Sequence, residues 1–460
     1  MENSLKNHDE SELLKSAPIG KLLLKFSVPC VLSMLVSALY NIVDQIFIGQ
    51  GVGYLANAAT NVVYPFTVFA LAISLLIGDG CAAFFSLSLG RGDKENAVKS
   101  AGNGIILTLI CAVLLTVVGF VFEEGLLRLF GVTEECYTYA KDYMDVILAG
   151  IPFYMFTSAM NSLIRADGSP AYSMIATAIG AVLNMILDPI AIFKLGLGVT
   201  GAAAATIIGQ IVTAVISALY LKKTKLFKLD KTSFKLSIKT VKKIALLGVS
   251  SFIIQIAIVT VMTVANNMIV IYGRLSVYGA EIPLAVIGIV MKVFAIVIAF
   301  IVGIAVGGQP IIGYNYGAKN YKRVILTLKT VIIANLIIGL IATLIFEFIP
   351  QAVVDIFGNE GELYNDYACK CFRIFLAGIM LLGVQKTGSI FLQSIGKSVK
   401  SIILSLSRDI IFFVPGLLIF TPVWGVTGML YIAPICDVLS FILTVVFLYS
   451  EYRNMKRQMA

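Results

Sequence analysis

Twelve stretches of the sequence are apolar over about twenty residues or more, and they limit the possible folds more than any other feature. They lie at roughly 22–48, 57–88, 98–121, 138–164, 171–193, 199–221, 244–271, 284–315, 325–349, 364–392, 399–420 and 425–449. A helix needs about 20 apolar residues to cross the hydrocarbon core of a bilayer. Of the 460 residues, 59% are hydrophobic and only 13% are charged, against about a quarter charged in soluble domains. The sequence therefore predicts an all-α integral membrane protein with twelve transmembrane helices, surrounded by lipid bilayer.

The basic residues predict the orientation of the chain. If the first span enters from the cytoplasm, most Lys and Arg residues fall in cytoplasmic segments, above all in the lysine-rich segment 222–243. Six fall on the outer side: Arg128, Lys141, Lys194, Arg274, Lys370 and Arg373. Because loops rich in Lys and Arg remain in the cytoplasm, we expect a multi-pass cell-membrane protein with both termini inside. The net charge of +9 then reflects topology and indicates no nucleic-acid partner.

Histidine and cysteine usage argues against metal, haem and nucleotide chemistry. His8 is the only histidine and lies in a polar N-terminal segment that lacks the features of a signal peptide. The seven cysteines form no Cys-x-x-Cys pair, and the sequence has no HExxH or P-loop motif. We therefore interpret the cysteines as small apolar side chains and expect neither a cofactor nor an enzymatic activity.

The chain contains an internal repeat of 227 to 228 residues. The string LAGI starts at residues 148 and 376, and GVTG starts at residues 198 and 425. Each half then holds six spans, an even number, so the two halves share one orientation and are related by an axis along the membrane normal. The predicted units are an N-lobe at 1–221, a basic cytoplasmic linker at 222–243 and a C-lobe at 244–460. Parallel repeats of this kind are typical of transporters, whose substrate site lies between the repeats.

Two carboxylates lie inside predicted spans of the first half. Asp44 follows Tyr40 by four residues, and Asp188 follows Asn184 by four, so each acid shares a helix face with its neighbour. Lys25 to Asp44 and Ser169 to Asp188 are each about 28 Å of helix, which predicts a similar depth for both acids. A charge inside a span is expensive and usually functional. The pair is a candidate site for a proton or Na⁺; the alternative is that Asp188 caps a helix end and Asp44 lies at the interface.

Several strings in the sequence resemble the multidrug and toxic compound extrusion (MATE) family, in its DinF-type and staphylococcal-type branch. They are YNIVDQIFIGQ in the first span, SLGRGDKENA after the second, IRADGSP after the fourth, NMILDP in the fifth and GQPIIGYNYGAKNYKRV closing the eighth. The resemblance implies an antiporter of the bacterial cytoplasmic membrane that is coupled to H⁺ or Na⁺ and needs no other cofactor. It also implies alternating access, small-molecule substrates that are mostly organic cations, and a functional monomer.

The resemblance also implies which residues form the cation site. Asp44, Asn184, Asp188 and Thr206 carry over to it directly, and Tyr40, Tyr143 and Asn161 with less support. A second site in the other half is not expected, because the acids that another branch of the family uses in spans seven and ten are missing here.

Other polar residues in the predicted spans are candidates for the substrate cavity: Asp79, Gln255, Asn266, Lys292, Gln309 and Asp437. For Asp79, Lys292 and Asp437 two interpretations remain open, structural pairing with one another or lining of the cavity. Arg408 and Asp409, adjacent in sequence, predict a structural ion pair.

Two other functions compete with the antiporter. A flippase for a lipid-linked sugar or peptidoglycan precursor has a related architecture, but its cavity should be strongly basic, and Lys292 and Lys386 are the only basic residues deep within spans. A membrane-embedded transferase would need a His/Asp or Asp-x-Asp pair near the interface, and the sole His lies in the N-terminal segment.

Overall fold

A computed structural model describes residues 13–130, 132, 134–230, 232–279, 281–357 and 361–459, so His8 lies outside the described residues. Within these ranges the regular secondary structure is entirely helical. The helices are α2 (Ile19–Gly51), α3 (Tyr54–Gly90), α4 (Lys94–Val121), α5 (Glu123–Leu129), α6 (Glu134–Ala166), α7 (Pro170–Pro189), η1 (Ile190–Lys194), α8 (Gly198–Tyr220), α9 (Ile238–Gly273), α10 (Glu281–Gly317), α11 (Tyr321–Phe348), α12 (Pro350–Phe357), α13 (Glu362–Phe375), α14 (Ile379–Ser394), α15 (Ser398–Leu406), η2 (Ser407–Phe413) and α16 (Val414–Met459).

The described helices confirm the predicted membrane fold. Ten helical segments are long and apolar enough to cross a bilayer, and α13 with α14, bent by 47° at their junction, forms an eleventh. The last segment, Ser398–Met459, has 62 residues; as one straight helix it would be ~93 Å long, about three times the hydrocarbon thickness. Gly425, with φ 67° and ψ −167°, divides it into two spans.

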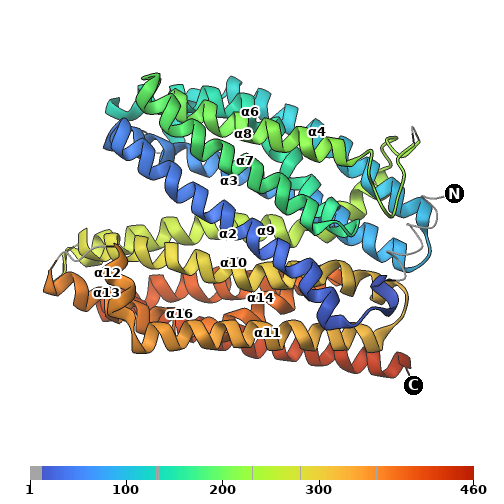
Figure 1. Cartoon of the computed structure of the whole chain (residues 1–460). Helices are drawn as coiled ribbons and strands as arrows, with labels where there is room; N and C mark the ends of the chain where they lie inside the picture. The colour runs from blue at the N-terminus through green and yellow to red at the C-terminus, as the bar shows by residue number, and fades with distance from the viewer. Residues whose placement is uncertain are drawn as a thin grey trace.

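The helices form two bundles, and α2 begins on the same side as α16 ends (Figure 1). In the N-terminal bundle, α2 to α8, helix α6 packs against α3, α4 and α8, and α7 packs against α2 and α8. In the C-terminal bundle, α9 to α16, helix α14 packs against α10, α11 and α16. Helix α2 runs diagonally and contacts both α7 and α10 (Figure 1).

The bundles meet in a contact zone, which we call the seam, formed by α3 against α9 and α2 against α10. At the end where α2 begins and α16 ends, it also brings Gly90 against the backbone of Tyr314. In one part of it α3 packs against α9, and a Cβ at Gly248 would collide with the backbone of Leu76. In the other part α2 packs against α10, and a Cβ at Gly303 would lie 2.8 Å from the Cα of Val31. Only glycine allows backbones to approach this closely.

Beyond the seam, the side chains of α2 are less buried. Its buried residues end at Val31 and resume only at Ile48. The intervening segment, 32–47, therefore packs on fewer sides than the part within the seam, although it contains Asp44.

Candidate functional site

Asp44 of α2 and Asp188 of α7 meet inside the N-terminal bundle. Asp188 is fully buried and Asp44 is half-buried, and the two carboxyl groups lie close enough to interact electrostatically. Two carboxylates this close repel each other when both are ionised, so the arrangement favours a proton or a cation between them.

Asn184 and Thr206 complete this cluster. The Asn184 Nδ2 donates to Asp188 Oδ1 at 3.1 Å and to Thr206 Oγ1 at 3.2 Å. Three buried oxygens of the cluster, Asp44 Oδ1, Asp188 Oδ2 and Asn184 Oδ1, have no hydrogen-bond donor among the described residues. Carboxylate and amide oxygens suit a hard cation, and a carboxyl pair equally suits one shared proton.

Two tyrosines stand close to the acids. Tyr40, one turn before Asp44, and Tyr143 of α6 both interact electrostatically with Asp44 and Asp188. Tyr154 interacts with Tyr40 and joins the same group, a residue that the sequence analysis did not name. The spacing in the sequence could have indicated Tyr154, because it follows Tyr143 by eleven residues, about three helical turns, and so lies on the same face of α6.

Asn161 belongs to a different group. Its side chain donates to Thr177 Oγ1 at 3.3 Å and accepts from Ser173 Oγ at 3.0 Å. Ser173 precedes Asp188 by fifteen residues on α7, about 22 Å of helix. The structure therefore does not bring Asn161 to the acid pair.

Asp79 lies in the seam and not beside Lys292. It accepts hydrogen bonds from Ser162 Oγ at 2.6 Å and from Ser251 Oγ, across the seam, at 2.8 Å. Arg165 supplies the positive charge, with its guanidinium 3.8 Å away. The Ser251 hydroxyl also accepts from Gln393 Nε2 at 3.1 Å, so a polar chain crosses from one bundle to the other.

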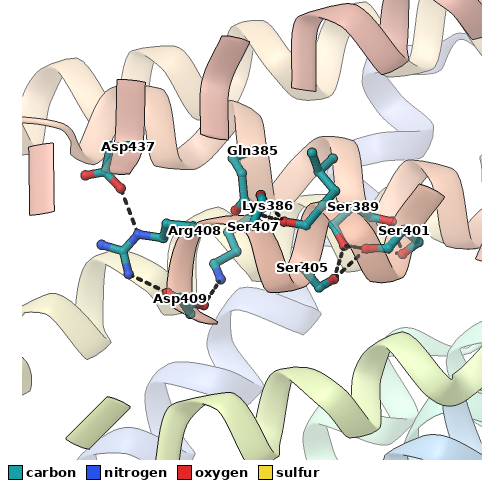
Figure 2. Close-up of polar contacts among 10 residues, drawn as sticks. Gln385, Lys386, Ser389, Ser401, Ser405, Ser407, Arg408, Asp409 and Asp437 are labelled. Atoms are coloured by element: carbon teal, nitrogen blue, oxygen red, sulfur yellow. Dashed lines mark hydrogen bonds and ion pairs between the residues drawn. The ribbon is translucent and has the colours of Figure 1, made fainter. Parts of the chain in front are cut away.

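Asp437 is paired inside the C-terminal bundle. Arg408, on the π-helical turn η2, contacts Asp437 and Asp409, each at 2.7 Å, and Lys386 lies 3.3 Å from Asp409 (Figure 2). The Arg408–Asp409 pair predicted from the sequence is thus one part of a buried cluster of two positive and two negative groups.

The remaining cavity candidates differ in exposure. Asn266 and Lys292 are exposed, and Gln255 is half-buried. Gln309 is only 7% exposed, and its Nε2 has no acceptor among the described residues. Lys292 makes no hydrogen bond or ion pair with any side chain in the described part of the chain.

Comparisons with known proteins agree with this architecture. The chain is 23% identical to the multidrug export protein MepA of Staphylococcus haemolyticus (strain JCSC1435) over 95% of this chain and 94% of that protein. It is 24% identical to MepA of Staphylococcus aureus (strain N315), again over 95% and 94%. It superposes with a TM-score of 0.90 on a structure described as the outward-facing conformation of a multidrug resistance MATE family transporter, with 26% identity over 97% of this chain and 98% of the other.

The family model MatE matches this chain twice, at residues 29–190 and at residues 251–418. The first match contains Asp44 and Asp188, and the second contains Arg408 and Asp409. Because the two matches together cover more than half of the sequence, the chain belongs to the MatE family and is a MATE-family transporter, not an enzyme.

Proposed function

We propose that this protein exports bulky amphipathic compounds, mostly organic cations, in exchange for H⁺ or Na⁺. The observation that supports this proposal best is the pair of interacting acids, Asp44 and Asp188, whose buried oxygens lack donors among the described residues. Among its relatives, the MepA proteins are named multidrug export proteins. We further propose that it works as a monomer in the bacterial cytoplasmic membrane.

The acid pair can control where α2 lies. With a proton or cation between them, Asp44 and Asp188 attract each other and hold the outer part of α2 against α7. With neither, two like charges repel by an amount of the order of 4 kcal/mol at about 4 Å and an effective dielectric constant of about 20. That repulsion is large enough to shift a conformational equilibrium by several hundredfold.

Movement of α2 would reach both bundles. The same helix contacts α7 near Asp188 and packs in the seam against α10 through Val31. We propose that residues 1–221 and 244–460 move as two bodies joined by 222–243, and that ion binding and substrate binding alternate through this movement. Ion binding then changes the affinity for substrate because the two ligands favour different arrangements.

The described conformation fits the outward-facing state of such a cycle. The bundles touch at the end where α2 begins and α16 ends, as at Gly90 and Tyr314. The positive-inside distribution of Lys and Arg favours a cytoplasmic position for that end. The space beyond the seam would then open to the outside.

The test is transport by the purified protein in liposomes. A fluorescent organic cation is followed under an imposed pH gradient and, separately, an imposed Na⁺ gradient. We expect one gradient to drive export in the wild type, and Asp44→Asn or Asp188→Asn to abolish it while the protein stays folded and still binds the dye. Asp142→Asn, at an exposed acid on α6, is the matched control. Full gradient-driven export by the Asp44→Asn, Asp188→Asn double variant would show that coupling occurs elsewhere.

A further inference from the structure

One face of α10 turns from a packed surface into an exposed one. In the seam this face packs against α2, through Gly303 and Gly307. Lys292 precedes Gly303 by eleven residues, about three helical turns, and so lies on the same face. Ala285, Gly288 and Ala295 follow the same spacing, and all are exposed like Lys292. Lys292 therefore lies, beyond the seam, on the face of α10 that packs against the N-terminal bundle within the seam.

The opposing faces of α2 and α9 can be identified in the same way. On α2, Gln45 follows the seam residue Ser27 by eighteen residues, or five turns, and is exposed. On α9, Asn266 follows the seam residue Gly248 by eighteen residues and is also exposed. The faces of α2 and α9 that continue the seam thus carry exposed amides, and the corresponding face of α10 carries the ammonium group of Lys292.

The neighbouring acids do not neutralise this lysine. Asp44 lies about 100° around α2 from the face of Gln45 and interacts with Asp188. Asp79 is held in the seam by Ser162, Ser251 and Arg165. Asp437 is bound to Arg408. Among the described residues, none of these carboxylates contacts Lys292.

Lys292 lies seven residues into the apolar span Ala285–Gly317, about 10 Å from its start, and a lysine within a span that lacks a carboxylate faces water or a ligand. In a transporter, substrate binds between the two repeats. An ammonium group without a carboxylate partner attracts an acidic group and repels a second positive charge.

We propose that Lys292 binds an acidic group of the transported compound, so that the protein prefers amphipathic compounds with a carboxylate, including zwitterions, over compounds that are only cationic. This inference rests on the proposed export function and shifts its preferred substrates from purely cationic compounds to amphipathic compounds that also carry a carboxylate. Lys292 is a specificity residue in this scheme, and the coupling ion remains at Asp44 and Asp188.

Two dyes of the same shape test the preference. Rhodamine 110 has a free benzoate, and rhodamine 123 is its methyl ester and carries only positive charge. Binding to the purified wild-type protein is measured by fluorescence anisotropy. We expect the acid to bind about tenfold more tightly than the ester, as for one charge-assisted hydrogen bond. Equal or weaker binding of the acid would overturn the proposal.

Substitutions then assign the preference to one side chain. Lys292→Met should remove the tenfold difference in affinity by weakening the binding of rhodamine 110 alone. Lys292→Arg should keep most of the difference. Lys329→Met, at an exposed lysine of α11, should leave it intact. If Lys292→Met weakens the binding of both dyes equally, and Lys292→Arg binds them no more tightly than Lys292→Met, the lysine has only a structural role.

The binding assay and the transport assay can fail separately. Export of either dye under an ion gradient tests the antiport function, and the ratio of the two affinities tests Lys292. If neither gradient drives export but the ratio holds, the antiport proposal fails and the Lys292 proposal stands.

Discussion

The Ser251 hydroxyl of α9 donates a hydrogen bond of 2.8 Å to Asp79 Oδ2 of α3, and this bond joins the two bundles across the seam. Ser162 and Arg165 of its own bundle hold the Asp79 carboxylate in place, so that it is oriented to accept the hydrogen bond from Ser251. A charged acceptor makes this bond stronger than most, about 1.5–3 kcal/mol.

Removing that bond should loosen the seam. We predict that Ser251→Ala increases the population in which the bundles are apart by about tenfold or more. A cysteine introduced at Leu76, labelled with a thiol reagent from the side where α2 begins and α16 ends, measures this population. Ser250→Ala is the control, because its hydroxyl is buried without a partner among the described residues. Equal labelling of the two alanine variants would contradict the role of Ser251.

Asn184 and Asn161 should behave differently, although family resemblance places both at the cation site. Asn184→Ala removes the donor to Asp188 Oδ1 and should reduce ion-driven export by about tenfold, as expected when a ligand-orienting group is lost. Asn161→Ala breaks contacts only with Ser173 and Thr177 and should leave the ion dependence unchanged. Measuring export rate against ion concentration separates the two; a shifted ion dependence in Asn161→Ala would place that residue at the site.

The buried ion cluster around Arg408 should be needed for folding. Arg408→Met leaves Asp437 and Asp409 with fewer positive partners and should cost about 3–5 kcal/mol of stability. Adding Asp437→Asn should recover part of this loss, because the new variant buries one fewer unpaired charge. Thermal unfolding in detergent measures both, and an unchanged transition in the single variant would contradict the prediction.

Asp167, in the turn between α6 and α7, should make the contact with the basic segment sensitive to pH. It accepts hydrogen bonds from Tyr220 Oη at 2.6 Å, Lys225 N at 2.7 Å and Leu226 N at 2.7 Å. Burial raises the pKa of its carboxyl to about 7, although these donors and the charge of Lys225 oppose the rise.

The sign of the effect follows from the raised pKa. The folded protein holds the proton more tightly than the unfolded chain, whose Asp pKa is about 3.9. The stabilisation is complete below about pH 4 and is lost as pH rises through 7, by at most about 1.4 kcal/mol per pH unit. Protection of the amides at residues 221–229 from hydrogen exchange, corrected for the intrinsic pH dependence of exchange, should therefore fall between about pH 4 and 7. Asp167→Asn cannot titrate and should remove this dependence; an identical pH dependence in that variant would assign it to another group.

Hydropathy predicted the fold well because each span must be apolar to lie in lipid. The twelve windows correspond to the helices that the structure describes, including the pair α13 and α14 and the two spans divided at Gly425. The GVTG repeat pointed to that last boundary, since its second copy begins at Gly425.

The partners of the buried charges were harder to predict. Equal depth predicted that Asp44 and Asp188 lie near each other, because α2 and α7 start from the same side of one bundle, and the two acids interact in the structure. That they bind the coupling ion stays a prediction. Depth alone could not show whether Lys292 or Arg165 is the positive partner of Asp79. That choice depends on which helix faces are in contact, and the long arginine side chain reaches further into the span than its backbone position indicates.

The glycines of the seam carry a mechanical consequence. At Gly248 and Gly303 the opposing helices meet through main chain. Beside these points, apolar side chains bury one another across the seam: Ile244 and Leu247 of α9 share a core cluster with α3, and Phe26 of α2 shares one with α10. Separation must therefore wet apolar side chains as well as backbone and break the Asp79–Ser251 bond, and we expect the barrier to arise from all three. Bulky residues at the two glycines do not fit the closed seam and should shift the resting protein toward the state in which the bundles are apart.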